Sequence, residues 1–178
     1  MTKSIKISNK SLRQPFTCTE AFIQNVCKGA CCRKSGGGTM ITIHPSEEQR
    51  FLDKGIEVKD HKIVCGNRCP FQNGDGLCIL HPTGEKPFGC VASPFTLNKN
   101  GTLILRNRYR LFRCYKAEGA EPAYKTFRAS LDIIFGKELA EHIVARVQES
   151  EDDFFVDIDE GVYNKLQEND AFKKPQKS

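Results

Sequence analysis

The hydrophobic and polar positions divide the chain into an irregular first part and a helical last part. From Glu121 onward, apolar residues recur every three or four positions, which predicts one amphipathic helix ending before Gly136 and a second over about 137–149. An acidic stretch follows, in which residues 154–156 form either a short strand or a docking segment. A weaker helix is expected near 160–169.

The irregular first part holds only short regular segments. Residues 1–16 read as a polar arm, and a strand is expected at 39–43. A helix over about 47–54 follows, with Ser46 and Gln49 in a capping-box pattern at its start.

Glycine, proline and asparagine dominate residues 65–90, so this segment is expected to bury little apolar area. Two short apolar runs, 95–97 and 102–105, flank an Asn-Gly pair, which is typical of a β-hairpin because that turn requires positive φ angles. These patterns predict an α+β protein: a small irregular cysteine-rich region with a β-hairpin over 1–120, packed against a helical segment over 121–178. We expect the two segments to form one structural domain.

The composition adds one feature that bears on function: the chain has nine cysteines in 178 residues. Disulfide bonds would need an oxidising compartment, whereas the polar N-terminus lacks the apolar stretch of a secretory signal. No run approaches the roughly 18 apolar residues of a membrane-spanning helix. We therefore expect a cytoplasmic protein with reduced cysteines and no membrane partner. Thiols that merely pack in the core are the remaining alternative, and the clustering of seven cysteines between Cys18 and Cys78 argues against it.

The spacing of the cysteines favours metal coordination. Close pairs let one turn of backbone present two thiolates to one centre, and more distant cysteines complete a tetrahedral zinc site or an iron–sulfur cluster. Cys31 and Cys32 are adjacent, and successive side chains of extended backbone point to opposite sides. We therefore expect two neighbouring centres, or one ligand and one free thiol. His81, three residues after Cys78, would favour zinc as a ligand, and a surface position is its alternative.

Three separated elements resemble the YkgJ-type cysteine-cluster family, a zinc- or iron-chelating domain with a CxxCxxCC signature. The elements are VCKGACCRK at 26–34, GLCILH at 76–81 and KPFGCVASPF at 86–95. The resemblance covers about residues 16–115 and implies metal binding. The family's biochemical role is largely undefined, so the resemblance implies no particular activity.

The leading hypothesis is a metal-binding protein that holds an iron–sulfur cluster or zinc, with the thiolate-rich inventory favouring the cluster. The preferred ligands are Cys27, Cys31, Cys32, Cys69, Cys78 and Cys90, and the reserve ligands are Cys18, Cys65, Cys114 and His81. A redox or group-transfer enzyme that uses the cluster or the vicinal thiols is the first alternative. Cys114, close to several arginines that would lower its pKa, is the candidate reactive thiol. No known catalytic motif occurs, so the sequence leaves open whether the protein is an enzyme.

A second alternative starts from the charge distribution. Residues 1–120 carry a net charge of +10 and residues 121–178 one of −5. Arg106, Arg108 and Arg110 alternate, so in a strand they would line one face and could bind an acidic protein or a nucleic acid. The protein would then be a zinc-stabilised interaction module, whereas a solvated edge strand guarded by positive charge is the simpler interpretation.

Overall fold

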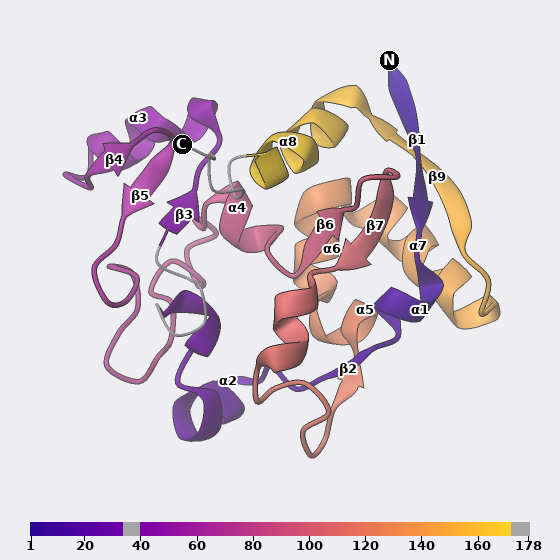
Figure 1. Ribbon diagram of the computed structural model, residues 1–178, viewed down its shortest axis with the longest axis horizontal. Helices are drawn as coiled ribbons and strands as arrows, with labels where there is room; N and C mark the ends of the chain where they lie inside the picture. The colour runs from indigo at the N-terminus through magenta and orange to yellow at the C-terminus, as the bar shows by residue number, and fades with distance from the viewer. Residues whose placement is uncertain (34–39, 172–178) are drawn as a thin grey trace.

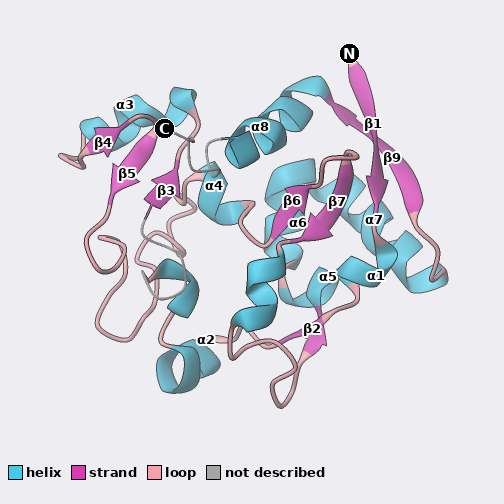
Figure 2. Ribbon diagram, in the orientation of Figure 1, coloured by secondary structure: helices cyan, strands magenta, loops and turns pink. Residues whose placement is uncertain are grey.

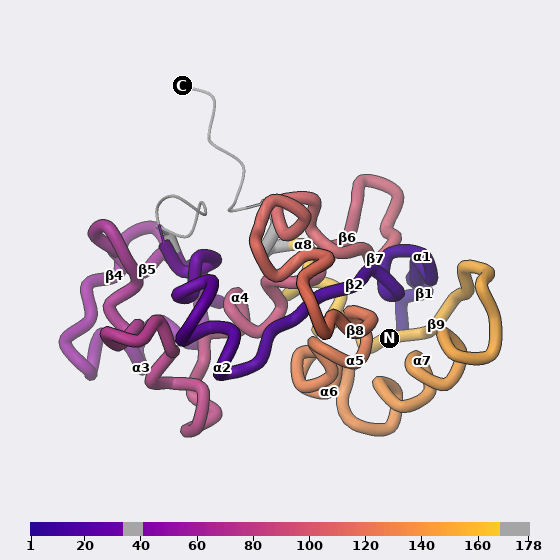
Figure 3. Tube along the Cα trace, turned by 90° about the horizontal axis from the view of Figure 1, so that it is seen from below, coloured from indigo at the N-terminus to yellow at the C-terminus, as the bar shows by residue number. Residues whose placement is uncertain are grey.

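The computed structural model shows two lobes that lie side by side (Figure 1). The structure describes residues 1–33 and 40–171. We call residues 1–16 and 92–171 the sheet lobe, and residues 20–33 and 40–91 the cysteine lobe. Figure 3, a view from below, shows an elongated molecule with the two lobes at opposite ends. Both lobes combine helices with short strands (Figure 2), which confirms the α+β prediction.

A four-stranded sheet of order β6-β7-β1-β9 frames the sheet lobe. The central strand β1 (Thr2–Ile7) pairs parallel with β7 (Thr102–Leu105) and antiparallel with β9 (Phe154–Asp159). Ile5 and Ile7 are at most 1% exposed, because residues two apart in a strand share one face and this face meets the core. The prediction of a polar N-terminal arm is therefore wrong.

Three consecutive helices share the apolar core of this lobe with the sheet. They are α5 (Ala123–Thr126), α6 (Arg128–Phe135) and α7 (Lys137–Glu149). Gly136, with a φ angle of +80°, separates α6 from α7, which confirms the predicted helix end. The expected strand at 154–156 and helix near 160–169 are also confirmed, as β9 and α8 (Glu160–Ala171). Within the described part of the chain, no helix is long and apolar enough to cross a membrane.

The predicted β-hairpin is confirmed by the antiparallel pairing of β6 (Phe95–Leu97) with β7. The Asn98 side chain accepts hydrogen bonds from the backbone N–H groups of Asn100 and Thr102, at 2.9 and 3.0 Å. Gly101 adopts the φ angle of +71° that this turn requires. The short elements of the lobe are α1 (Asn9–Leu12), β2 (Pro15–Phe16), the 3-10 helix η4 (Asn107–Leu111) and β8 (Glu121–Pro122).

The cysteine lobe is built on a three-stranded sheet of order β3-β5-β4. Its strands are β3 (Met40–Thr42), β4 (Val58–Lys59) and β5 (Lys62–Val64). Its helices are α2 (Glu20–Phe22), the π-helix η1 (Ile23–Cys27), the 3-10 helix η2 (Ala30–Cys32), α3 (Pro45–Leu52) and α4 (Phe88–Val91). The strand expected at 39–43 is thus confirmed over Met40–Thr42 and ends one residue earlier than expected, while residue 39 lies outside the described residues.

Helix α3 begins two residues earlier than expected and has a different cap. His44 is the N-cap: its Nδ1 accepts the backbone N–H of Ser46 at 3.2 Å. The Glu47 carboxylate accepts the backbone N–H of His44 at 3.0 Å and completes the capping box. Pro45 occupies the first helical position, where its missing N–H costs nothing. The predicted capping box of Ser46 and Gln49 is therefore wrong, because His44 and Glu47 form it instead.

A small apolar core holds the cysteine lobe together. Its buried residues are Ile41, Ile43, Phe51, Ile63, Cys69, Phe71 and Leu80. The last three come from residues 65–90, the segment expected to bury little apolar area, so that expectation is wrong in part. The core is nevertheless small beside the cluster of 23 buried residues in the sheet lobe.

Candidate functional site

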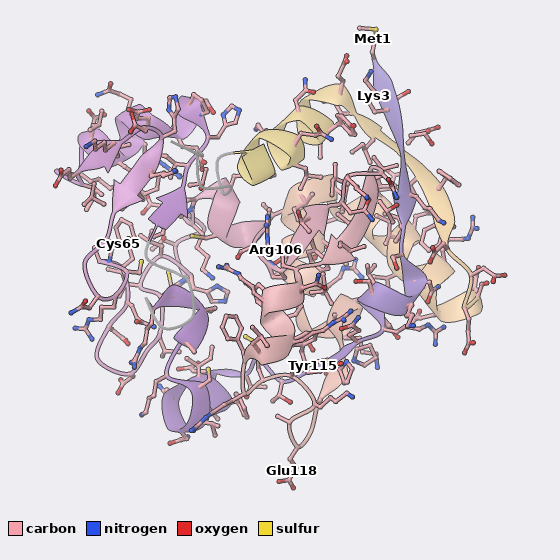
Figure 4. All side chains as sticks on the ribbon, viewed as in Figure 1. Met1, Lys3, Cys65, Arg106, Tyr115 and Glu118 are labelled. Carbon is pink, nitrogen blue, oxygen red and sulfur yellow. The ribbon has the colours of Figure 1, made fainter. Side chains whose placement is uncertain are left out.

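A cleft of about 1560 Å³ lies between the two lobes, and eight of the nine cysteines line it. These eight are Cys18, Cys27, Cys31, Cys32, Cys69, Cys78, Cys90 and Cys114. All nine cysteines are free thiols. Figure 4 shows Cys65 in the cysteine lobe and Arg106, a cleft residue, across from it in the sheet lobe. The fold therefore brings together cysteines that are up to 96 positions apart in the chain.

A sharp backbone turn positions Cys27, Cys31 and Cys32. After the π-helix that ends at Cys27, Lys28 and Gly29 both adopt left-handed conformations, with φ angles of +52° and +63°. The chain then enters the 3-10 helix that carries Cys31 and Cys32. A Cβ atom on Gly29 would collide with Gln72 Nε2 and with the backbone oxygen of Gly76, so this position requires glycine.

The buried amide of Gln72 fastens this turn to the second cysteine segment. Its Nε2 donates to the backbone carbonyls of Lys28, Gly29 and Gly76, at 3.3, 3.1 and 3.0 Å. A Cβ atom on Gly76 would lie 2.5 Å from the Lys28 carbonyl carbon, so the two loops touch backbone to backbone. The backbone N–H of Cys69 also donates to the Cys32 carbonyl at 3.1 Å.

The sulfur atoms of Cys31 and Cys32 lie 3.9 Å apart. This distance is far too long for a disulfide bond of about 2.05 Å. The expectation that adjacent thiols point apart assumed extended backbone, whereas the observed 3-10 turn brings both sulfurs to the same side.

Cys18 and Cys114 both interact electrostatically with Cys27 and Cys31, and we call these four cysteines the outer thiols. Cys31 also interacts with Cys32 and Cys69. Cys18 keeps an exposed surface and Cys114 is buried in the core of the sheet lobe. Desolvation by the surrounding protein and negative charge on Cys27 and Cys31 raise the pKa of Cys18 to about 11 and that of Cys114 to about 12. The prediction that arginines lower the pKa of Cys114 is therefore wrong, because burial dominates.

Cys32 belongs to a second group, which we call the inner thiols: Cys32, Cys65, Cys69 and Cys90. A hydrogen bond between Cys65 and Cys69 lowers the pKa of Cys65 and, together with burial, raises that of Cys69. The hydrogen bond that the Cys32 thiol donates to Cys31, together with burial and charge on neighbouring thiols, raises the pKa of Cys32. All four inner thiols belong to or pack against the apolar core of the cysteine lobe, as does the ninth cysteine, Cys78.

Cys31 is the acidic member of the outer thiols. The hydrogen bond from Cys32 is the largest cause, and the positive charges of Arg108 and Lys86 add to it against the effect of burial. Together they lower the pKa of Cys31 to about 7. A thiolate at this position is available at neutral pH, both as a nucleophile and as a metal ligand.

The thiols do not stand at coordination distance as they are. Among residues 1–33 and 40–171, no three His, Cys, Asp or Glu side chains are arranged so that they could hold a metal ion. Metal binding would therefore require the sulfur atoms of a group to move closer together.

Two histidines, His61 and His81, line the cleft. His81 is exposed, lines the cleft and donates its backbone N–H to the Cys78 carbonyl at 3.1 Å. The charge of Lys86 and, to a lesser degree, burial lower the pKa of its ring. His61 pairs with Glu48 at 2.7 Å, and His142 is exposed on α7.

The arginine row does not form the predicted strand face. Residues 107–111 form a 3-10 helix, because the strand β7 ends at Leu105 and the chain turns to bury Tyr109. Arg108 consequently reaches Ser93 in the cleft, whereas Arg110 donates to Gln14 at 2.9 Å on the exposed side. Both the edge-strand interpretation and the single arginine face are wrong.

Gln72 is a site residue that sequence reasoning missed, because a glutamine among turn residues looks like any exposed loop amide. Lys86 was noted only as the first residue of the third element of the family resemblance. The nearest signal for Gln72 is the pair of glycines that it joins, since Gly29 and Gly76 each lie two residues before a cysteine.

Comparisons with known proteins add no identity: no protein-family model, no curated protein and no solved structure matches this chain.

Proposed function

We propose that the protein binds metal through its clustered cysteines, as an iron–sulfur cluster or as zinc. The convergence of eight free thiols, drawn from both lobes, on one cleft carries this proposal. Burial and neighbouring thiolates raise the pKa of several of these thiols, so deprotonating the whole cluster without a metal would be costly. A bound metal ion removes this penalty because it stabilises the deprotonated form of every ligand.

The two groups of four thiols match the ligand number of the expected centres. Structural zinc and the common iron–sulfur clusters are both held by four protein ligands. The inner thiols would form a centre within the cysteine lobe, and the outer thiols one that includes Cys114 of the sheet lobe. Cys78 is left outside both groups. The resemblance of the three cysteine-containing elements to YkgJ-type proteins supports the same class of function.

Anaerobic purification followed by elemental analysis and an absorbance spectrum tests the proposal. We expect zinc, up to two ions per chain, in a colourless protein, or iron with sulfide in a brown protein that dithionite bleaches. A protein without stoichiometric metal that keeps its fold in the presence of a chelator would refute metal binding.

Thiol-based redox or group-transfer catalysis is the second candidate, because the pKa of Cys31 is about 7 and the thiol lines an open cleft. Metal content separates the two candidates. A catalytic thiol in a metal-free protein predicts full modification of Cys31 by iodoacetamide in the protein as purified, whereas a metal ligand predicts protection until the metal is removed.

A further inference from the structure

Positive charges from both lobes line the cleft around Cys31. Lys86 precedes α4 in the cysteine lobe, whereas Arg106 and Arg108 come from the start and middle of the 3-10 helix η4 in the sheet lobe. All three side chains are only partly exposed. Lys86 and Arg108 both lower the pKa of Cys31, so the two walls place their charges near the same thiol.

The side chain of Arg108 is held in a fixed position. Its Nη2 donates to Ser93 Oγ at 2.9 Å, and the Tyr109 hydroxyl donates to the same oxygen at 2.9 Å. The guanidinium carbon lies 5.5 Å from the centre of the Tyr109 ring. A guanidinium fixed in this way has lost its rotamer freedom before any ligand arrives, and its planar fork suits carboxylate and phosphate oxygens.

Apolar side chains lie in the same cleft. Phe112 and Phe127 line it from the sheet lobe, and Ile133 of α6 lines it with 60% of its surface exposed. Pockets for small molecules combine such apolar walls with a few fixed polar or charged groups. The cleft therefore offers charge for one end of a ligand and apolar surface for the rest.

We infer that the cleft binds a small organic oxyanion, a carboxylate or a phosphate ester with an apolar body, between Lys86 and Arg108. Its acidic group lies beside Cys31 and its apolar part against the Phe112–Ile133 wall. A role as substrate of the thiol centre rests on the proposed function, whereas the binding itself needs only the two cations. The competing explanation is that these cations only balance the charge of the thiolates.

Calorimetric titration of the protein as purified, with the metal content of the same batch measured, tests the inference. Phenyl phosphate and phenylacetate are the probes, and their comparison distinguishes a phosphate from a carboxylate site. Benzyl alcohol has the apolar ring without an acidic group, and inorganic phosphate has the acidic group without the ring, so these two compounds are the half-ligand controls. We expect at least one aromatic oxyanion to bind more tightly than both of these half-ligands.

Variants of the cations decide whether binding occurs at this site. Lys86→Met and Arg108→Gln should each weaken binding on the order of ten-fold or more, since each removes a charge-assisted contact. Arg110→Gln is the matched control, because Arg110 is an exposed neighbour in η4 that points to Gln14. It should leave the affinity unchanged. If Arg108→Gln disturbs the fold, Lys86→Met alone decides.

Three results would overturn the inference: no binding of either aromatic oxyanion, equal loss with Arg110→Gln, or affinity that is independent of Lys86. Altered Cys31 reactivity in the variants without any oxyanion binding would establish the charge-balancing explanation instead. Binding that depends on Lys86 in a protein without metal would support the oxyanion site while refuting the proposed function. Failure of the oxyanion site and failure of the proposed metal binding therefore give different results.

Discussion

Replacing Gly29 with alanine tests the loop that positions the vicinal thiols. Its φ angle of +63° costs an alanine about 1 kcal/mol. The added Cβ would also collide with Gln72 Nε2 and the Gly76 carbonyl oxygen, so Gln72 would have to leave its three carbonyl partners. The three carbonyls share the two hydrogens of Nε2, and each hydrogen bond contributes about 0.5–1.5 kcal/mol, so we expect Gly29→Ala to lower the free energy of unfolding by about 2–4 kcal/mol.

Gly55 supplies the matched control. Its φ angle is +72°, but a Cβ atom there meets nothing within 4 Å, so Gly55→Ala should cost only about 1 kcal/mol. Urea unfolding followed by circular dichroism measures both variants. Since small domains have slopes of about 1–3 kcal/mol per molar urea, the two midpoints should differ by roughly 1 M. If the two variants lose the same free energy of unfolding, the contact between the two cysteine segments is not formed as described.

The remaining predictions concern the thiols and the two lobes. In metal-free protein, alkylation of Cys31 should be half-maximal near pH 7, and Lys86→Met should move the midpoint to higher pH; an unchanged midpoint would contradict the assigned charge effect. Cys69→Ser should abolish metal binding at the inner thiols, whereas Cys78→Ser should leave the metal content unchanged in elemental analysis; equal losses would refute the grouping. Removal of metal by a chelator should expose the amides of β5 to hydrogen exchange while those of β1 stay protected, because the two strands belong to cores of different size. Simultaneous loss of protection in both strands would show that the lobes unfold as one unit.

Local sequence signals predicted the elements whose structure depends on neighbouring residues. The helix expected over 137–149 has these bounds because the apolar period and Gly136 act within a few positions of each other. The hairpin at 95–105 formed as expected because the Asn98 side chain and Gly101 define the turn on their own. Such elements can be read without knowledge of the tertiary fold.

Elements that depend on distant partners were misread. The strand β1 is central only because β9, about 150 positions away, pairs with it, and nothing in its own polar sequence indicates this. The row of alternating arginines has the pattern of a strand, yet burial of Tyr109 against Phe16 and Phe127 makes a tight helical turn the better solution. A two-residue period over only five residues does not separate the two conformations.

The sequence predicted that the cysteines gather at one site, but it did not predict which of them meet. Cys18, Cys65 and Cys114 were only reserve ligands, because the elements of the family resemblance match the other six cysteines. The structure brings all three next to other thiols, whereas Cys78 has no described thiol interaction beyond its packing against the small apolar core. Which cysteines meet is a property of the tertiary fold, and a single sequence holds no record of it.

The uneven distribution of buried residues indicates where metal would matter most. The sheet lobe holds a cluster of 23 buried residues, whereas the cysteine lobe holds one of seven, with four further thiols packed at its edge. A structural zinc ion contributes about 10–16 kcal/mol in small zinc-binding peptides, which is comparable to the whole net stability of a typical domain at about 5–15 kcal/mol. Metal binding at the inner thiols would therefore contribute more free energy than the small apolar core of that lobe lacks.

A centre at the outer thiols would act differently, because Cys31 and Cys114 come from different lobes. It would fix the distance between the two walls that carry Lys86 and Arg108, so metal binding and oxyanion binding would strengthen each other across the same cleft.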